Sequence, residues 1–142
     1  MADIEVIDAH VHAFENDDRG ILYQRGNGGE RELKRTGSLE ELEKLMKEAG
    51  ISHSIMLMYT PTRYMYEARI RQQELPADPA ERRAIEQEVR TMMAQRMIEN
   101  NEWGIKVSQQ HPEFVTFAGL DPVYMDEETL VGEMGFLWLV IL

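Results

Sequence analysis

Near the N-terminus a short, mostly apolar run, Ile4-Glu5-Val6-Ile7-Asp8-Ala9-His10-Val11-His12, ends in two histidines separated by one residue. The run is rich in β-branched residues and too short for an independent helix, so it predicts a β-strand. Because side chains alternate across a strand, Asp8, His10 and His12 are expected on one face, with the two rings nearly parallel. Two imidazoles placed in this way can bind one divalent cation, most simply zinc. The other interpretation of the pair is structural, with one ring exposed and the other hydrogen-bonded.

The stretch Val6-Ile7-Asp8-Ala9-His10-Val11-His12 resembles the first barrel strand of the metal-dependent amidohydrolase superfamily. It is most similar to the amidohydrolase-related branch, which includes aromatic-acid and semialdehyde decarboxylases, lactonases and hydratases. The resemblance implies that His10 and His12 bind a catalytic divalent metal at the C-terminal mouth of a (β/α)8 barrel. It also implies that Asp8 is an inward-facing supporting residue.

A second region is similar to the same family at its second helix and third strand. It begins at Asn101 and Trp103, passes through His111-Pro112 and Phe114, and ends at Leu120-Asp121-Pro122. The family's other ligands, histidines of the fifth and sixth strands and an aspartate of the eighth, have no counterpart in this sequence. The resemblance therefore implies an incomplete ligand set.

Length and charge limit the class of protein. The 142 residues are too few for a closed eight-stranded barrel, which typically needs roughly 250 residues. The formal net charge of −11 argues against nucleic acid as a partner, since phosphate binding needs a basic surface. The chain has no cysteine and no run of the ~20 apolar residues that cross a bilayer, and its acidic start predicts that it has no secretion leader. We therefore expect one partial barrel domain over residues 1–142, located in the cytoplasm, with no membrane partner.

Alternating strand and helix patterns predict an α/β fold of parallel βα units. The resemblance implies that these are about three N-terminal βα units of a partial (β/α)8 TIM barrel. Strands are expected at residues 4–12, 51–59 and 114–120, as parallel neighbours in chain order. The first two are apolar on both faces, which is typical of buried parallel strands.

Three helices are predicted from their N-terminal caps. A capping box at Ser38 and Glu41 opens the first, and Asp78 caps the second. The second helix is expected to break near Asn100, and Asp126 is expected to cap the third.

Two long connections leave the presumed catalytic ends of the strands. Residues 13–37 predict either a substrate-covering loop or a disordered insertion. Residues 60–77 contain several arginines, one of which could bind a substrate carboxylate; the alternative is solvated charges on an irregular or short helical segment. His53 lies at the start of the second predicted strand and His111 in a turn before the third, both at the opposite end, and neither is expected to bind the catalytic metal.

The apolar run over residues 135–142 departs from the amphipathic pattern of a barrel helix. One interpretation is a barrel enzyme truncated or frame-shifted after about residue 134, and the other is a small protein whose last strand completes a sheet.

The resemblance therefore implies the N-terminal part of a metal-dependent hydrolase. Its full-length relatives would activate water, or decarboxylate a carboxylated small-molecule substrate, at a divalent metal that we expect to be zinc. The alternative is a non-catalytic fragment or interaction module with a vestigial metal site. This chain alone is expected to be inactive and to bind zinc weakly, because a catalytic zinc normally has three protein ligands. It is also expected to self-associate through an open sheet edge.

Overall fold

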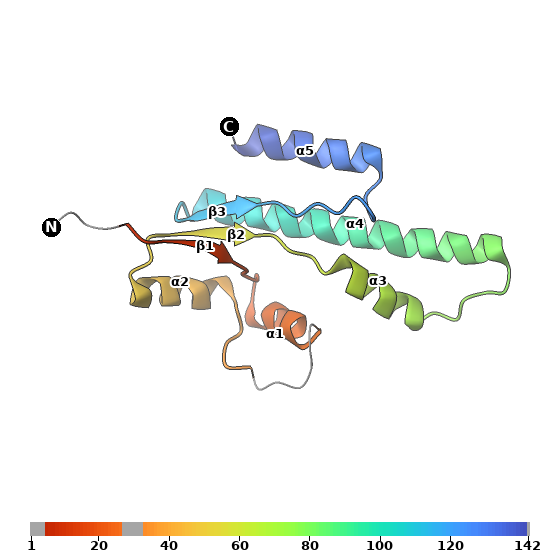
Figure 1. Ribbon diagram of the computed structural model, residues 1–142, viewed down its shortest axis with the longest axis horizontal. Helices are drawn as coiled ribbons and strands as arrows, with labels where there is room; N and C mark the ends of the chain where they lie inside the picture. Colours follow the sequence, from red (N-terminus) through yellow and green to blue (C-terminus); the bar gives the residue numbers. More distant parts are fainter. Residues whose placement is uncertain (1–4, 27–32, 142) are drawn as a thin grey trace. The chain divides into compact units, whose positions relative to one another are not determined.

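The computed structural model describes residues 5–26 and 33–141, which form an α/β structure (Figure 1). Its strands are β1 (Ile7–Val11), β2 (His53–Leu57) and β3 (Phe114–Phe117), and its helices are α1 (Asp17–Gly26), α2 (Leu39–Ala49), α3 (Thr62–Arg71), α4 (Pro79–Gln110) and α5 (Glu127–Ile141). The chain divides into two compact units. The first extends to Leu57 and includes Lys106–Phe117, and the second comprises Met58–Ile105 and the residues from Ala118 onward.

The first unit contains an open three-stranded sheet in the order β1-β2-β3. Both pairs are parallel, with Ile7 opposite His53 and with β2 and β3 in continuous register from Ser54–Phe114 to Leu57–Phe117. The expected parallel order is therefore confirmed, although each strand is shorter than its apolar run.

The register of β1 against β2 contains one irregularity. Asp8 lies opposite Ser54, and Val11 lies opposite Met56, so three steps along β1 match two along β2. One extra residue in β1 is the pattern of a β-bulge, which changes the phase of side-chain alternation. The prediction of strict alternation from residue 4 to residue 12 is therefore wrong, because it placed Asp8 and Val11 on opposite faces.

One face of the sheet is covered. Ser54 and Met56 of β2 are fully buried, as is Phe114 of β3. Helix α2 lies against this face, where the Ser54 hydroxyl donates to the sulfur of Met46 at 3.3 Å. The last turn of α4 contacts it as well, since the hydroxyls of Ser108 and Thr116 are 2.6 Å apart.

The other face carries apolar side chains that remain open. Ile7, Val115 and Phe117 are exposed by 55%, 48% and 55%. The apolar sequences of β1 and β2 predicted two buried faces. Among the described residues, this second face is exposed at Ile7 of β1 and only half-buried at Ile55 and Leu57 of β2.

Residues 13–37, expected as an irregular connection, contain helix α1. The Asn16 side chain accepts a hydrogen bond from the Arg19 backbone N–H at 3.0 Å, which is an ordinary N-cap. The rings of Phe14 and Tyr23 pack with centroids 4.7 Å apart, which holds the helix beside the end of β1. Tertiary packing thus gives this segment structure, and residues 27–32 of the predicted covering loop lie outside the described residues.

The capping box of α2 forms in part. Ser38 occupies the N-cap position, but its side chain makes no capping hydrogen bond. The Glu41 carboxylate reaches back further than expected, to the N–H of Gly37 at 2.9 Å and to the N–H and hydroxyl of Thr36 at 2.7 and 3.0 Å. One carboxylate therefore fixes the turn that precedes the helix.

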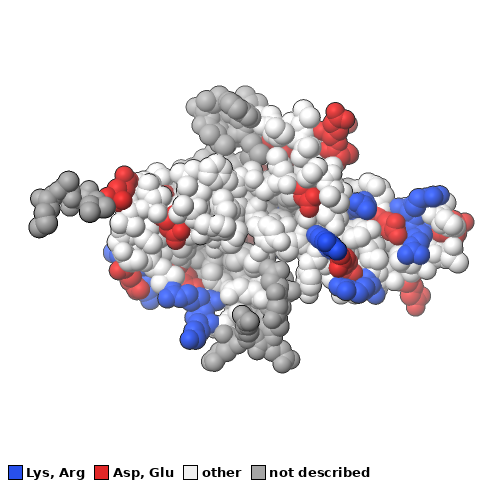
Figure 2. Space-filling model, in the orientation of Figure 1, with Lys and Arg blue, Asp and Glu red and all other residues white. Residues whose placement is uncertain are grey.

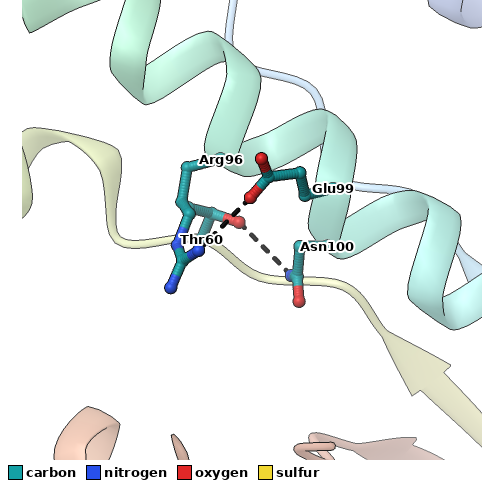
Figure 3. Close-up of polar contacts among 4 residues, drawn as sticks. All are labelled: Thr60, Arg96, Glu99 and Asn100. Atoms are coloured by element: carbon teal, nitrogen blue, oxygen red, sulfur yellow. Dashed lines mark hydrogen bonds and ion pairs between the residues drawn. The ribbon is translucent and has the colours of Figure 1, made fainter.

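The second unit is built on α4, which continues through the break predicted near Asn100. The Asn101 side chain is 1% exposed; its amide donates to the Gly119 carbonyl and its oxygen accepts from the Gly119 N–H, both at 2.9 Å. Asn100 donates to the Thr60 hydroxyl at 3.3 Å, one turn from the Arg96–Glu99 pair (Figure 3). Long-range partners thus stabilise asparagines whose intrinsic helix propensity is low.

The aspartate caps predicted for α4 and α5 are confirmed. Asp78 accepts from the N–H of Ala80 at 2.6 Å at the start of α4, and Asp126 accepts from the N–H of Thr129 at 2.8 Å at the start of α5. The backbone of α5 stays helical to Ile141, so a final strand over these residues is ruled out. None of the helices in the described parts of the chain is both long enough and apolar enough to cross a membrane.

Candidate metal centre

The rings of His10 and His12 converge beyond the carboxyl end of β1. Their Nε2 atoms are 3.2 Å apart and their ring centroids 5.0 Å apart. Both side chains are exposed, on the face of the sheet opposite buried Val11. The expected convergence is therefore confirmed, at an exposed position of the first unit.

The ring planes are nearly perpendicular, at 87°, so the expectation of parallel rings is wrong. The reason is that His12 lies just past the strand, where the strand geometry no longer sets the direction of its side chain, and its ring turns toward β2. Its Nδ1 atom is 2.9 Å from the carbonyl oxygen of Leu57. Because a carbonyl oxygen can only accept, Nδ1 carries the hydrogen, and the Nε2 lone pair of neutral His12 points toward His10.

The spacing of the two nitrogens suits a tetrahedral cation. Zinc–imidazole bonds of 2.0–2.1 Å give a nitrogen–nitrogen edge of about 3.3 Å in a tetrahedron, and the Nε2 atoms of His10 and His12 are 3.2 Å apart. The same contact can also be a hydrogen bond in which His10 donates to His12. The geometry therefore accommodates either a shared proton or a shared metal.

Asp8 does not support the pair in the expected way. Its carboxylate accepts a hydrogen bond from the backbone N–H of His10 at 3.1 Å, and its Cα lies opposite that of Ser54. Residues paired across parallel strands point to the same face, so Asp8 shares the face of Ser54 rather than that of the rings. Its role in this structure is to fix the backbone of the extra residue in β1.

Among the described residues, His10 and His12 have no third ligand close enough to complete the group. The arginine-bearing segment after β2 forms helix α3, where Arg63 pairs with Glu67 at 2.9 Å and is 86% exposed. Arg63 thus matches the alternative of a solvated charge on a short helix. The pair by itself supplies two of the three protein ligands usual for a catalytic zinc.

The remaining two histidines lie at the amino ends of the strands, as predicted. The Nδ1 atom of His53 is 2.9 Å from the Glu5 carboxylate, and that of His111 is 2.7 Å from the Glu43 carboxylate. His111 is also 3.9 Å from the Glu113 carboxylate. Sequence reasoning missed this second group, since Glu43 lies far from His111 in the chain and only the parallel sheet brings them together.

Acidic and basic side chains are mixed on the face drawn in Figure 2, where lysines and arginines lie among aspartates and glutamates of the described residues.

No protein-family model, no curated protein and no solved structure matches the chain. The resemblance to amidohydrolase-related enzymes therefore stays a prediction, carried by the sequence stretches at His10–His12 and Leu120–Pro122.

Proposed function

We propose that this chain forms the first βα units of a metal-dependent hydrolase or decarboxylase of the amidohydrolase-related kind, with His10 and His12 as metal ligands. The observation that carries the proposal is the approach of their Nε2 atoms to 3.2 Å at the carboxyl end of a parallel strand. Substrates and catalytic groups gather at this end in parallel α/β proteins, because the loops that bear them leave the strands there. The parallel order of the three strands agrees with the start of a (β/α)8 barrel.

Each residue has a defined task in this proposal. His10 and His12 present their Nε2 lone pairs to the metal, and the Leu57 carbonyl fixes the His12 tautomer by accepting from Nδ1. A bound divalent metal would supply Lewis acidity for activating water or for orienting a carboxylated substrate. The open side of the sheet, which carries Ile7, Val115 and Phe117, is the side on which a barrel interior would lie.

The same open face favours a second candidate, an interaction module with a vestigial metal site. A sheet with three apolar side chains about half exposed favours a protein partner or a second copy. In that case the His10–His12 contact is a hydrogen bond with no metal affinity above that of a surface histidine pair.

A zinc titration followed on the imidazole resonances separates the two candidates, because the chain has only four histidines. Under the metalloenzyme proposal, zinc shifts the His10 and His12 signals together and saturates at one ion per pair, with modest affinity because only two ligands contribute. His10→Ala should abolish the shift at His12, whereas the matched control His53→Ala should leave it intact.

Unchanged His10 and His12 signals at a large excess of zinc would contradict the metal centre. If zinc does bind, activity assays on any longer form of the protein test the chemistry. They measure zinc-dependent cleavage of carboxylated esters, lactones or amides, and carbon dioxide release from carboxylated aromatics. Loss of that activity in His10→Ala, with retention in His53→Ala, is the expected result.

A further inference from the structure

A second cluster of metal-ligating side chains lies at the opposite end of the sheet from His10 and His12. It consists of Glu43 on α2 and of His111 and Glu113 in the turn between α4 and β3. One ligand atom from each lies within 4.8 Å of the others. All three side chains are about one-third exposed, so the group is partly shielded from solvent but open to a cation.

We propose that Glu43, His111 and Glu113 form a divalent-cation site that fastens α2 to the turn before β3. The donor set is one imidazole nitrogen and two carboxylate oxygens, which favours zinc and similar metals over magnesium or calcium. This site is independent of the proposed function, because it shares no residue with the His10–His12 pair.

Charge favours a cation at this position. The imidazole of His111 can carry at most one positive charge, whereas the carboxylates of Glu43 and Glu113 carry two negative charges when ionised. The cluster therefore keeps an excess of negative charge in either state of the histidine. A divalent ion neutralises this excess and bonds all three groups at once.

The distances require only small adjustments. His111 Nδ1 is 2.7 Å from the Glu43 carboxylate oxygen and 3.9 Å from that of Glu113. Tetrahedral zinc with bonds near 2.0–2.1 Å needs ligand separations of about 3.3 Å, so each of these two distances changes by about 0.6 Å. The Glu43–Glu113 separation lies within 4.8 Å and needs to close by at most about 1.5 Å. Rotations of the two glutamate side chains can supply such movements without moving the backbone.

The backbone of the turn is already held in place. The His111 N–H donates to the Val107 carbonyl at 2.8 Å, and the Phe114 N–H donates to the His111 carbonyl at 3.0 Å. The Glu113 carbonyl accepts from the Ser54 N–H of β2 at 2.9 Å. The His111 ring also packs edge-on near the ring of Phe114, with centroids 6.3 Å apart. A site on a backbone fixed in this way loses little entropy when it binds an ion.

The test uses the double variant His10→Ala/His12→Ala, so that zinc binding at the first pair cannot contribute. Zinc should shift the imidazole resonances of His111 and leave those of His53 unchanged. It should also raise the midpoint of thermal unfolding, because a ligand that binds only the folded state stabilises it. Magnesium at the same concentration should do neither.

Matched charge changes on α2 locate the site. In the His10→Ala/His12→Ala protein, Glu43→Gln and Glu113→Gln should each weaken zinc binding by about tenfold or more. Glu40→Gln removes the same charge from an exposed position on α2 and should leave the affinity unchanged. Far-UV circular dichroism without zinc checks that each variant is folded. If a glutamate variant does not fold, His111→Gln is tested in its place.

Three results would overturn the proposal. They are His111 resonances that do not respond to zinc, equal responses at His53 and His111, and equal zinc affinities for Glu43→Gln and Glu40→Gln. Because the readouts are separate histidines, failure of this site leaves the His10–His12 proposal untouched, and the reverse also holds.

Discussion

The Nδ1 atom of His12 lies 2.9 Å from the carbonyl oxygen of Leu57, so a side chain at the end of β1 is hydrogen-bonded to the backbone of β2. This bond has two consequences. It determines which nitrogen of His12 faces His10, and it adds a link between two strands that are only five residues long. A metal ligand here would therefore also be a stabilising residue.

We accordingly expect His12→Ala to lower the free energy of unfolding by about 0.5–1.5 kcal/mol more than His10→Ala, the typical net contribution of one hydrogen bond. Urea unfolding in the presence of a chelator measures both without any contribution from metal. Equal stabilities of the two variants would show that the bond to Leu57 contributes nothing measurable.

Asn101 should be a critical residue of the second unit. Asn101→Ala leaves the N–H and carbonyl of Gly119 without their partners, and we expect a loss of about 2–3 kcal/mol in the free energy of unfolding. Asn100→Ala is the matched control on the same helix, since it removes one longer bond from a half-buried side chain. Its cost should stay below about 1 kcal/mol in the same urea titration.

Gly119 should tolerate no side chain. A Cβ at this position would collide with the carbonyl oxygen of Met58, so Gly119→Ala should cost about 2 kcal/mol or more. Gly132→Ala in α5 meets nothing within 4 Å and should instead stabilise the protein by about 0.5–1 kcal/mol through higher helix propensity. Thermal unfolding of the two variants should therefore shift in opposite directions from the wild type.

Acid should weaken the turn before α2. The backbone N–H of Gly37, with help from Thr36, holds the pKa of the Glu41 carboxyl below its ordinary value. A lowered pKa in the folded state means that the stabilisation is complete above the ordinary pKa and is lost as the pH falls through the lowered one. Glu41→Gln should therefore be less stable than wild type at pH about 7, and the gap should shrink toward pH about 3.

Glu40→Gln, in the same first turn, controls for the interaction of acidic residues with the helix dipole. Its difference from wild type should vary less with pH than that of Glu41→Gln. Urea unfolding at both pH values measures the two gaps, and identical pH profiles would contradict the role given to Glu41.

The open face of the sheet should drive self-association. Replacing the exposed Val115 and Phe117 by threonine keeps β propensity and removes apolar area, so Val115→Thr/Phe117→Thr should reduce the average mass measured by light scattering. Val131→Thr changes a still more exposed valine, in α5, and should leave the mass unchanged. The same mass in both variants would mean that this face is not the contact.

The sequence by itself determined the three strands, the starts of α2, α4 and α5, and the order of these elements. Apolar β-branched runs, N-cap residues such as Asp78 and Asp126, and the alternation of strands with helices were enough to predict a parallel sheet in chain order. They were also enough to predict that His10 and His12 lie together, because two residues separated by one position at the end of a strand are necessarily near each other. These features depend on contacts within a few residues, which a linear pattern encodes directly.

Only the tertiary structure decided the features that depend on distant partners. The extra residue in β1 is defined by its register against β2 and takes Asp8 out of phase with the histidines. The continuity of α4 depends on Gly119, which satisfies Asn101 from 18 positions away. Glu43 and His111 meet because helix α2 and the turn before β3 lie against the same sheet. Hydrogen bonds and charge pairs of this kind are formed between segments far apart in the chain, and no local spacing of residues encodes them.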